Sequence, residues 1–139
     1  MSTYSQVYIH VVFSVQNRLP QLKKEWRDQL YKYIITIIQK HKHKVYAIGG
    51  IEDHIHILFS QNISHSIPNL MQEVKRDSSK WINENKFINY RFEWQEGYVA
   101  FSYNQKVVDE VVRYIHNQES HHTKQSSRDE FKEIGRAHV

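Results

Sequence analysis

The order of strand-like and helix-like segments constrains this chain more than any other feature of its sequence. β-Branched and aromatic runs, typical of strands, lie at residues 4–15, at 44–51, in the run that ends at Ser60, and at 92–103. Segments with apolar residues at helical spacing separate them, at 22–41 and 67–85. Strand, helix, strand, strand, helix, strand predicts an α+β fold, a ferredoxin-like split βαβ antiparallel sheet with helices on one face.

A further helix is predicted beyond this core, at residues 105–122, and a short polar helical segment after it. Its apolar stripe consists of Val107, Val108, Val111, Val112 and Ile115. The run at 92–103 is read either as a fourth strand or as a hairpin that turns at Glu96 and Gly97. The chain shows neither internal repeats nor a low-complexity linker, so we expect a single domain.

Composition narrows the class of protein. The 139 residues suffice for one domain with a proper core, and the absence of cysteine excludes disulfides and thiolate metal sites. Nothing at the N-terminus resembles a signal peptide, and no apolar run approaches the ~20 residues that span a bilayer. We therefore expect a cytoplasmic protein without a membrane partner. A net charge of +4 with ten histidines and nine tyrosines suits a nucleic-acid partner without requiring one.

The stretch GGIEDHIHILFS, residues 49–60, places two histidines inside an apolar run. On a strand His54 and His56 point to the same face, about 6.6 Å apart, while Ile55 and Ile57 point into the core. Two imidazoles on one face can converge on a single cation, since histidine is a common ligand of borderline metals. The alternative is that both rings form hydrogen bonds at a sheet edge.

Tyr114 and Gln118 are four residues apart in the predicted helix 105–122 and so share one of its faces. One reading makes Tyr114 a packing residue with its hydroxyl at the surface. The other makes it a nucleophile, which needs help because a phenol has a pKa of about 10. A cation held by His54 and His56 would polarise a phosphodiester, and Gln118 could supply a third, neutral oxygen ligand.

Four motifs in this order resemble a known family. They are HVVFSVQNR in the first strand, GGIEDHIHIL with its His-Ile-His, WQEGYVAFSY near the fourth strand, and YIHNQESHH around the tyrosine. Together they resemble the single-tyrosine HUH transposases of minimal bacterial insertion sequences, within the superfamily of REP-associated tyrosine transposases. The resemblance covers nearly the whole chain.

This resemblance implies a specific chemistry. Proteins similar to this one cleave and rejoin single-stranded DNA at hairpin-bearing element ends, through a 5′-phosphotyrosine intermediate that leaves a free 3′-hydroxyl. Tyr114 matches the nucleophile, His54 and His56 match the metal pair, and Gln118 matches the polar ligand. The metal would be Mg²⁺ or Mn²⁺, and imidazole ligands favour Mn²⁺. His121 and His122 would support the site from behind.

The resemblance also implies a homodimer in which the tyrosine helix reaches into the partner's site, although assembly within one chain stays open. Lys75, Arg76 and Lys80 on the second helix are candidate DNA contacts, with a merely solvated helical face as the alternative. Arg18 is a weaker candidate. Trp81 and Trp94 are assigned to the core, and His10, His41, His43 and His65 to structure or solvent. Asp53 would orient a histidine only if it lies within reach, since on a strand it would face away from His54.

The last seven residues do not fit the resemblance. The terminal EIGRAHV, residues 133–139, does not resemble a family C-terminus, so we expect 1–132 to be the transposase domain and 133–139 to be a non-native tail from a sequencing adapter.

Three rival functions stay open. They are a domesticated, non-catalytic protein that binds hairpin DNA, a metal-dependent phosphodiesterase that uses water as the nucleophile, and an HUH enzyme of plasmid replication or conjugation. The presence of all four site residues favours the transposase.

Overall fold

The computed structural model describes residues 6–121 of the chain, and in this part a four-stranded antiparallel sheet forms the centre. The strands are β1 (Tyr8–Ser14), β2 (Lys44–Ile51), β3 (His54–Ser60) and β4 (Val99–Tyr103). Their order across the sheet is β2-β3-β1-β4, so β1 lies between β3 and β4 and runs antiparallel to both. This order confirms the predicted ferredoxin-like α+β fold.

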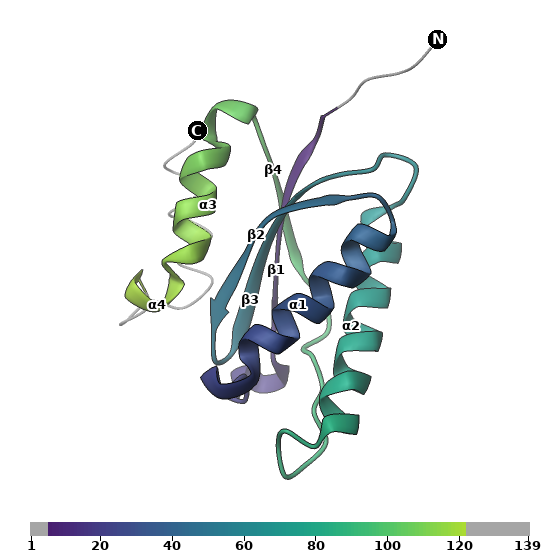
Figure 1. Ribbon diagram of the computed structural model, residues 1–139, viewed down its shortest axis with the longest axis vertical. Coiled ribbons are helices and arrows are strands. Elements are labelled where there is room, and N and C mark those ends of the chain that lie inside the picture. The colour runs from purple at the N-terminus through teal and green to yellow at the C-terminus, as the bar shows by residue number, and fades with distance from the viewer. Residues whose placement is uncertain (1–5, 122–139) are drawn as a thin grey trace.

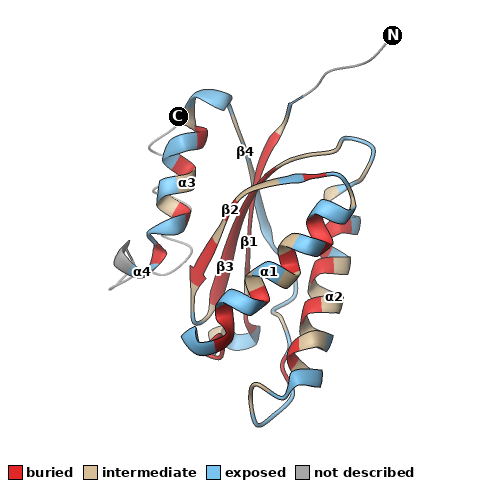
Figure 2. Ribbon diagram, viewed as in Figure 1, coloured by how far each residue is buried: buried red, intermediate tan, exposed pale blue. Residues whose placement is uncertain are grey.

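Helices α1 (Lys24–Lys40) and α2 (Ile67–Asn85) cover one face of the sheet (Figure 1). α2 begins where Ser66 Oγ accepts the Asn69 N–H at 3.2 Å and ends at Lys86, whose backbone is left-handed. Figure 2 shows buried residues concentrated on β1, β3 and the inner sides of both helices. This layer is filled by the core residues Val11, Phe13, Leu30, Ile34, Ile55, Ile57, Phe59, Leu70 and Val74.

The opposite face of the sheet packs against α3 (Val108–His116), which the short helix α4 (Gln118–His121) follows. A second, smaller core lies here, made of Tyr8, Ala47, Leu58, Val108, Val111 and Ile115. Gly49 on β2 permits the close approach, because a Cβ there would lie only 2.4 Å from the backbone oxygen of Ile115. The backbone of α3 therefore rests directly on the strand, and a side chain at position 49 would displace it.

The fourth strand is shorter than the run at 92–103 predicted, since only Val99–Tyr103 pairs with β1. Before it the chain makes one isolated bridge, between Val15 and Trp94. The Lys75 ammonium on α2 donates to the backbone oxygen of Gln95 at 2.8 Å and to that of Gly97. Gly97 has a φ of +87°, outside the extended region. These contacts tie the segment to α2, so neither a longer strand nor a hairpin forms.

The helix predicted over 105–122 is broken in two. A 3₁₀ turn (Gln105–Val107) begins where Asn104 Oδ1 accepts the Lys106 N–H at 3.0 Å, and α3 then ends at Asn117 with φ −101° and ψ 21°. The chain resumes as α4. The predicted polar helix after residue 122, His122 itself, the domain limit at 132 and the tail at 133–139 lie outside the described residues. None of the helices within 6–121 is both long and apolar enough to cross a bilayer.

Candidate active site

His54 and His56 lie on β3 and face α3, as the alternation of the strand predicts. In the sheet register they pair with Ser14 and Val12 of β1. Both side chains are fully buried, with 0% exposure, and their ring centroids are 5.0 Å apart at an interplanar angle of 65°. Two imidazoles at this separation on one face can share a cation.

Tyr114, on α3, contacts His56 of this histidine pair. Its ring lies edge-on to that of His56, with centroids 5.7 Å apart and an interplanar angle of 79°. Val111 and Ile115, buried on the same helix, hold α3 against the sheet. Within this chain the Tyr114 ring therefore lies against the ring of His56.

Gln118 also lies beside Tyr114, although the break at Asn117 places it in α4 rather than in the tyrosine helix. Its Nε2 donates to the backbone oxygen of Tyr114 at 3.1 Å, and the residue is only 1% exposed. Within the described part of the chain, its Oε1 accepts no hydrogen bond. A buried amide oxygen left in this state costs roughly 1–3 kcal/mol, a cost that a bound cation would remove.

Asp53 orients His54, which corrects the expectation that it faces the other way. Asp53 lies in the turn between β2 and β3, and its Oδ1 is 2.7 Å from His54 Nδ1. Burial alone would raise the pKa of Asp53, but the hydrogen bond and charge of His54, together with Arg18, outweigh burial and lower it. An ionised carboxylate only accepts, so Nδ1 of His54 carries the proton.

Arg18 pairs with Asp53 at the edge of the histidine site. Its guanidinium lies 3.1 Å from Asp53 Oδ2, and its side chain is 37% exposed. The residue predicted as a weak DNA contact is therefore held beside the histidine pair, where its charge also balances the Asp53 carboxylate.

His10 is the residue whose place in the site the sequence did not reveal. It is fully buried on β1, with Nε2 2.9 Å from His56 Nδ1 and Nδ1 3.2 Å from the Tyr103 hydroxyl. One histidine in an apolar strand resembles any core histidine. Only the pairing of β1 with β3, in which Val12 lies opposite His56, brings His10 and His56 together.

The donor set fits a divalent metal. Two imidazoles and a buried amide oxygen suit Mn²⁺ better than Mg²⁺, which prefers an all-oxygen octahedron. The Asp53–His54 hydrogen bond is the outer contact that metal-binding histidines ordinarily make. Among the described side chains there is no group of three or more His, Asp or Glu that could hold a metal. A site built on the two imidazoles would therefore draw on a donor of another kind, such as the Gln118 amide oxygen.

The candidate DNA contacts on α2 lie on the other face of the sheet from this site. Lys75 uses its ammonium to hold the segment 95–97, and burial lowers its pKa. Arg76 pairs with its neighbour Asp77 at 2.9 Å and stays largely exposed, as does Lys80. Trp81 and Trp94 pack, partly buried, against the main core as predicted. The structure therefore brings Tyr114 against His56, with His54 beside His56 and Gln118 bonded to the Tyr114 backbone, and leaves the α2 cations apart.

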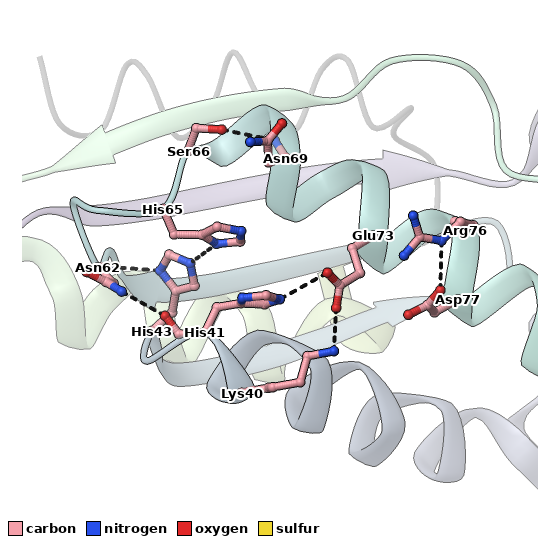
Figure 3. A network of polar contacts seen from close by, with 10 residues as sticks. All are labelled: Lys40, His41, His43, Asn62, His65, Ser66, Asn69, Glu73, Arg76 and Asp77. Atoms are coloured by element: carbon pink, nitrogen blue, oxygen red, sulfur yellow. Dashed lines mark hydrogen bonds and ion pairs between the residues drawn. The ribbon is translucent and has the colours of Figure 1, made fainter.

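Three other histidines, His41, His43 and His65, form a separate cluster between α1, β2 and α2 (Figure 3). His43 Nδ1 accepts the Asn62 N–H at 2.9 Å, so its proton lies on Nε2, which donates to His65 Nδ1 at 2.9 Å. His41 Nε2 lies 3.0 Å from Glu73 Oε1, and the His41 and His65 rings stack at 4.0 Å. Burial, followed by the charges of His65 and His41, lowers the pKa of His43 to about 4.

This cluster makes the folded state sensitive to acid. The unfolded chain binds a proton at His43 near the ordinary pKa of 6.5, whereas the folded chain does not until about pH 4. Between these values the unfolded state holds more protons, so stability falls as pH falls, by up to about 3 kcal/mol. Urea unfolding between pH 7 and pH 4 measures this loss. His43→Asn keeps an acceptor for Asn62 and does not titrate, so an equally steep loss in that variant would contradict the assignment.

The sequence and the fold both resemble those of known transposases. Residues 3–118 match the family model described as transposase, IS200-like. The fold is similar to that of a candidate transposase from Deinococcus radiodurans R1, with a TM-score of 0.69, 18% identity, and coverage of 85% of this chain and 95% of that chain.

The fold is also similar to that of a REP-associated tyrosine transposase solved with a REP hairpin. The TM-score is 0.65 with 18% identity, and the match covers 88% of this chain and 75% of that chain. No curated protein matches the chain. The family match extends from before β1 to the start of α4 and contains every residue of the site described above. The chain belongs to the family of IS200-like transposases.

Proposed function

We propose that this transposase cleaves and rejoins single-stranded DNA at hairpin-bearing ends, with Tyr114 as the nucleophile. The observation that carries the proposal is the contact of the Tyr114 ring with the fully buried His56, which lies beside His54, while Gln118 bonds the Tyr114 backbone. In the forward step the Tyr114 oxygen forms a bond to phosphorus and the bond from phosphorus to the 3′-oxygen breaks. The phenol loses its proton, the 3′-oxygen gains one, and the 5′-phosphate stays on the tyrosine. Rejoining reverses these steps.

His54, His56 and Gln118 would hold Mg²⁺ or Mn²⁺, which supplies polarisation of the phosphodiester and offsets its developing charge. The chain itself contributes geometry. Asp53 fixes the ring of His54, and the α3–sheet packing at Gly49 fixes the height of Tyr114 above the histidines. A rigid supporting shell of this kind keeps the nucleophile in place without reorganisation during the reaction.

Hairpin DNA is the proposed partner, and the relative solved with a REP hairpin supports this choice. Arg76 and Lys80 present exposed cations for phosphates, Arg18 stands at the site itself, and Lys75 adds charge while it anchors the segment 95–97. Phosphate contacts of this kind position a nucleic acid without reading its sequence.

A homodimer is proposed through β4. This strand lies at the edge of the sheet, and Val99 and Ala100 at its start are exposed, as the pale blue strand in Figure 2 shows. An exposed edge strand can pair with a second copy across a two-fold axis. Because Tyr114 already meets His56 of its own chain, such a dimer would not need to exchange α3 to complete its sites.

The proposed function is tested by incubating the protein with hairpin-bearing single-stranded DNA and Mn²⁺. We expect a covalent protein–DNA adduct on a denaturing gel, together with a product that carries a free 3′-hydroxyl. Hairpin binding without an adduct or cleavage would instead support the non-catalytic hairpin-binding protein. Cleavage without an adduct would support hydrolysis by water.

Binding should depend on DNA form and on salt. We expect affinity for a hairpin-bearing single strand to exceed that for a blunt duplex of equal length. Affinity should also fall steeply with salt, because each phosphate neutralised by a cation releases counterions, with a slope of about −0.7 to −0.9 per contact. Fluorescence anisotropy at several salt concentrations measures both. Equal affinities with equal slopes would indicate a generic basic surface rather than hairpin recognition.

A further inference from the structure

His10 links the proposed metal pair to the β4 side of the sheet. It lies on β1, the strand between β3 and β4, and its ring reaches both neighbours. Nε2 is 2.9 Å from His56 Nδ1, and Nδ1 is 3.2 Å from the Tyr103 hydroxyl. His10 and His56 are both fully buried, so the contact between them is shielded from water.

The chemistry of the two imidazoles fixes the direction of these hydrogen bonds if His56 is a ligand. A neutral histidine that offers Nε2 to a cation carries its proton on Nδ1. His56 Nδ1–H then donates to Nε2 of His10, whose own proton must be on Nδ1. That Nδ1–H donates to the Tyr103 oxygen. Burial raises the pKa of Tyr103, so the hydroxyl stays neutral beneath the site.

We propose that His10 is a positioning residue that holds His56 in its Nδ1–H form, so that Nε2 of His56 faces the metal. This inference rests on the proposed function. Each histidine of the pair then has one residue that fixes its tautomer, because Asp53 holds the Nδ1 proton of His54 in the same way. The supports differ in charge. The Asp53 carboxylate lies at a turn beside Arg18, whereas a carboxylate at the fully buried position 10 would be costly to desolvate, and a neutral imidazole avoids that cost.

A purely structural role for His10 makes a different prediction. If the His10–His56 contact only joined β1 to β3, any polar side chain of similar size would serve, and the tautomer of His56 would not matter. The proposed role requires an acceptor for the His56 Nδ1–H at the position of His10 Nε2. It tolerates loss of the contact between His10 Nδ1 and Tyr103.

Two amide substitutions separate these roles at the same buried position. The longer side chain of His10→Gln can place an oxygen near the former Nε2 and accept from His56. The shorter His10→Asn reaches only the place of Nδ1 and can contact Tyr103 but not His56. Both variants bury one amide, so their thermal unfolding midpoints should be similar and serve as the stability control.

The first measurement is the tautomer of His56 in the metal-free protein, read from the nitrogen-15 NMR signals of the imidazoles and assigned by the loss of signals in His56→Ala. We expect the Nδ1–H form in the wild type and in His10→Gln, and a shift toward the Nε2–H form in His10→Asn. A wild-type His56 protonated on Nε2, or one unaffected by His10→Asn, would overturn the inference.

The second measurement is the dissociation constant for Mn²⁺, by calorimetry without DNA. We expect His10→Asn to raise it by about 10–100-fold, the usual effect of losing an outer hydrogen bond to a ligand, and His10→Gln to stay close to wild type. Equal weakening in both variants would leave only a structural role. His56→Ala tests the metal assignment separately from the role of His10: if this variant binds Mn²⁺ as tightly as wild type, His56 is not a ligand, whatever His10 does.

Discussion

Tyr114→Phe is expected to abolish the covalent DNA adduct while leaving the protein folded. The substitution removes one oxygen and keeps the ring, so the edge-on contact with His56 and the packing of α3 on the sheet should persist. Cleavage should fall by at least about a thousandfold, as is typical when a nucleophile is removed. A denaturing gel of protein incubated with labelled hairpin DNA and Mn²⁺ measures the adduct.

Tyr90→Phe provides the matched control, because Tyr90 is 60% exposed and lies in the connection between α2 and β4. It should form the adduct as well as wild type does. Tyr103 is the tyrosine whose hydroxyl lies against His10, but it is held on β4 and separated from His56 by the His10 ring. An adduct that survives Tyr114→Phe would remove Tyr114 from the mechanism.

The cis arrangement can be examined with mixed subunits. One batch carries Tyr114→Phe and the other His56→Ala, and subunit exchange is confirmed with tagged copies. Since Tyr114 meets His56 of its own chain, every subunit in the mixture lacks one half of its site, and we expect no cleavage. Recovered cleavage would show that α3 is exchanged between partners.

The sequence predicted the parts of this fold that depend on local periodicity. Alternation along the run 54–60 placed His54 and His56 on one face and Ile55 and Ile57 on the other, and the structure agrees. Helical spacing correctly predicted α1 and α2, because each buries one continuous apolar stripe against the sheet. The element order then restricted the topology to the one found.

The sequence could not predict contacts between distant segments. The helix break at Asn117 has no strong local signal, yet Arg27 of α1 bonds Glu119 at 2.6 Å, 92 positions away, and so fixes where α4 lies. Strand propensity at 92–98 was overridden by the Lys75 ammonium from α2. His10 joined the site only through strand register, and Asp53 reached His54 only because it stands in a turn. Each of these depends on tertiary geometry rather than on pattern.

His56→Ala is expected to eliminate cleavage while leaving hairpin binding nearly intact. The substitution removes one of the two imidazoles proposed as metal ligands, and with it the partner of His10. Hairpin affinity should change little, because phosphate contacts rather than the metal position the DNA. Cleavage rate and anisotropy, measured on the same preparation, separate the two effects.

Because His56 is fully buried, its removal leaves a cavity and costs stability, so a second variant and a control are needed. His56→Asn fills more of the space yet is too short to replace Nε2, and it should be as inactive as His56→Ala. His65→Ala removes a histidine from the other cluster, on the α1–α2 side, and should retain cleavage. If folded His56→Asn cleaved at the wild-type rate, His56 would not be a ligand, and its contact with Tyr114 would be packing alone.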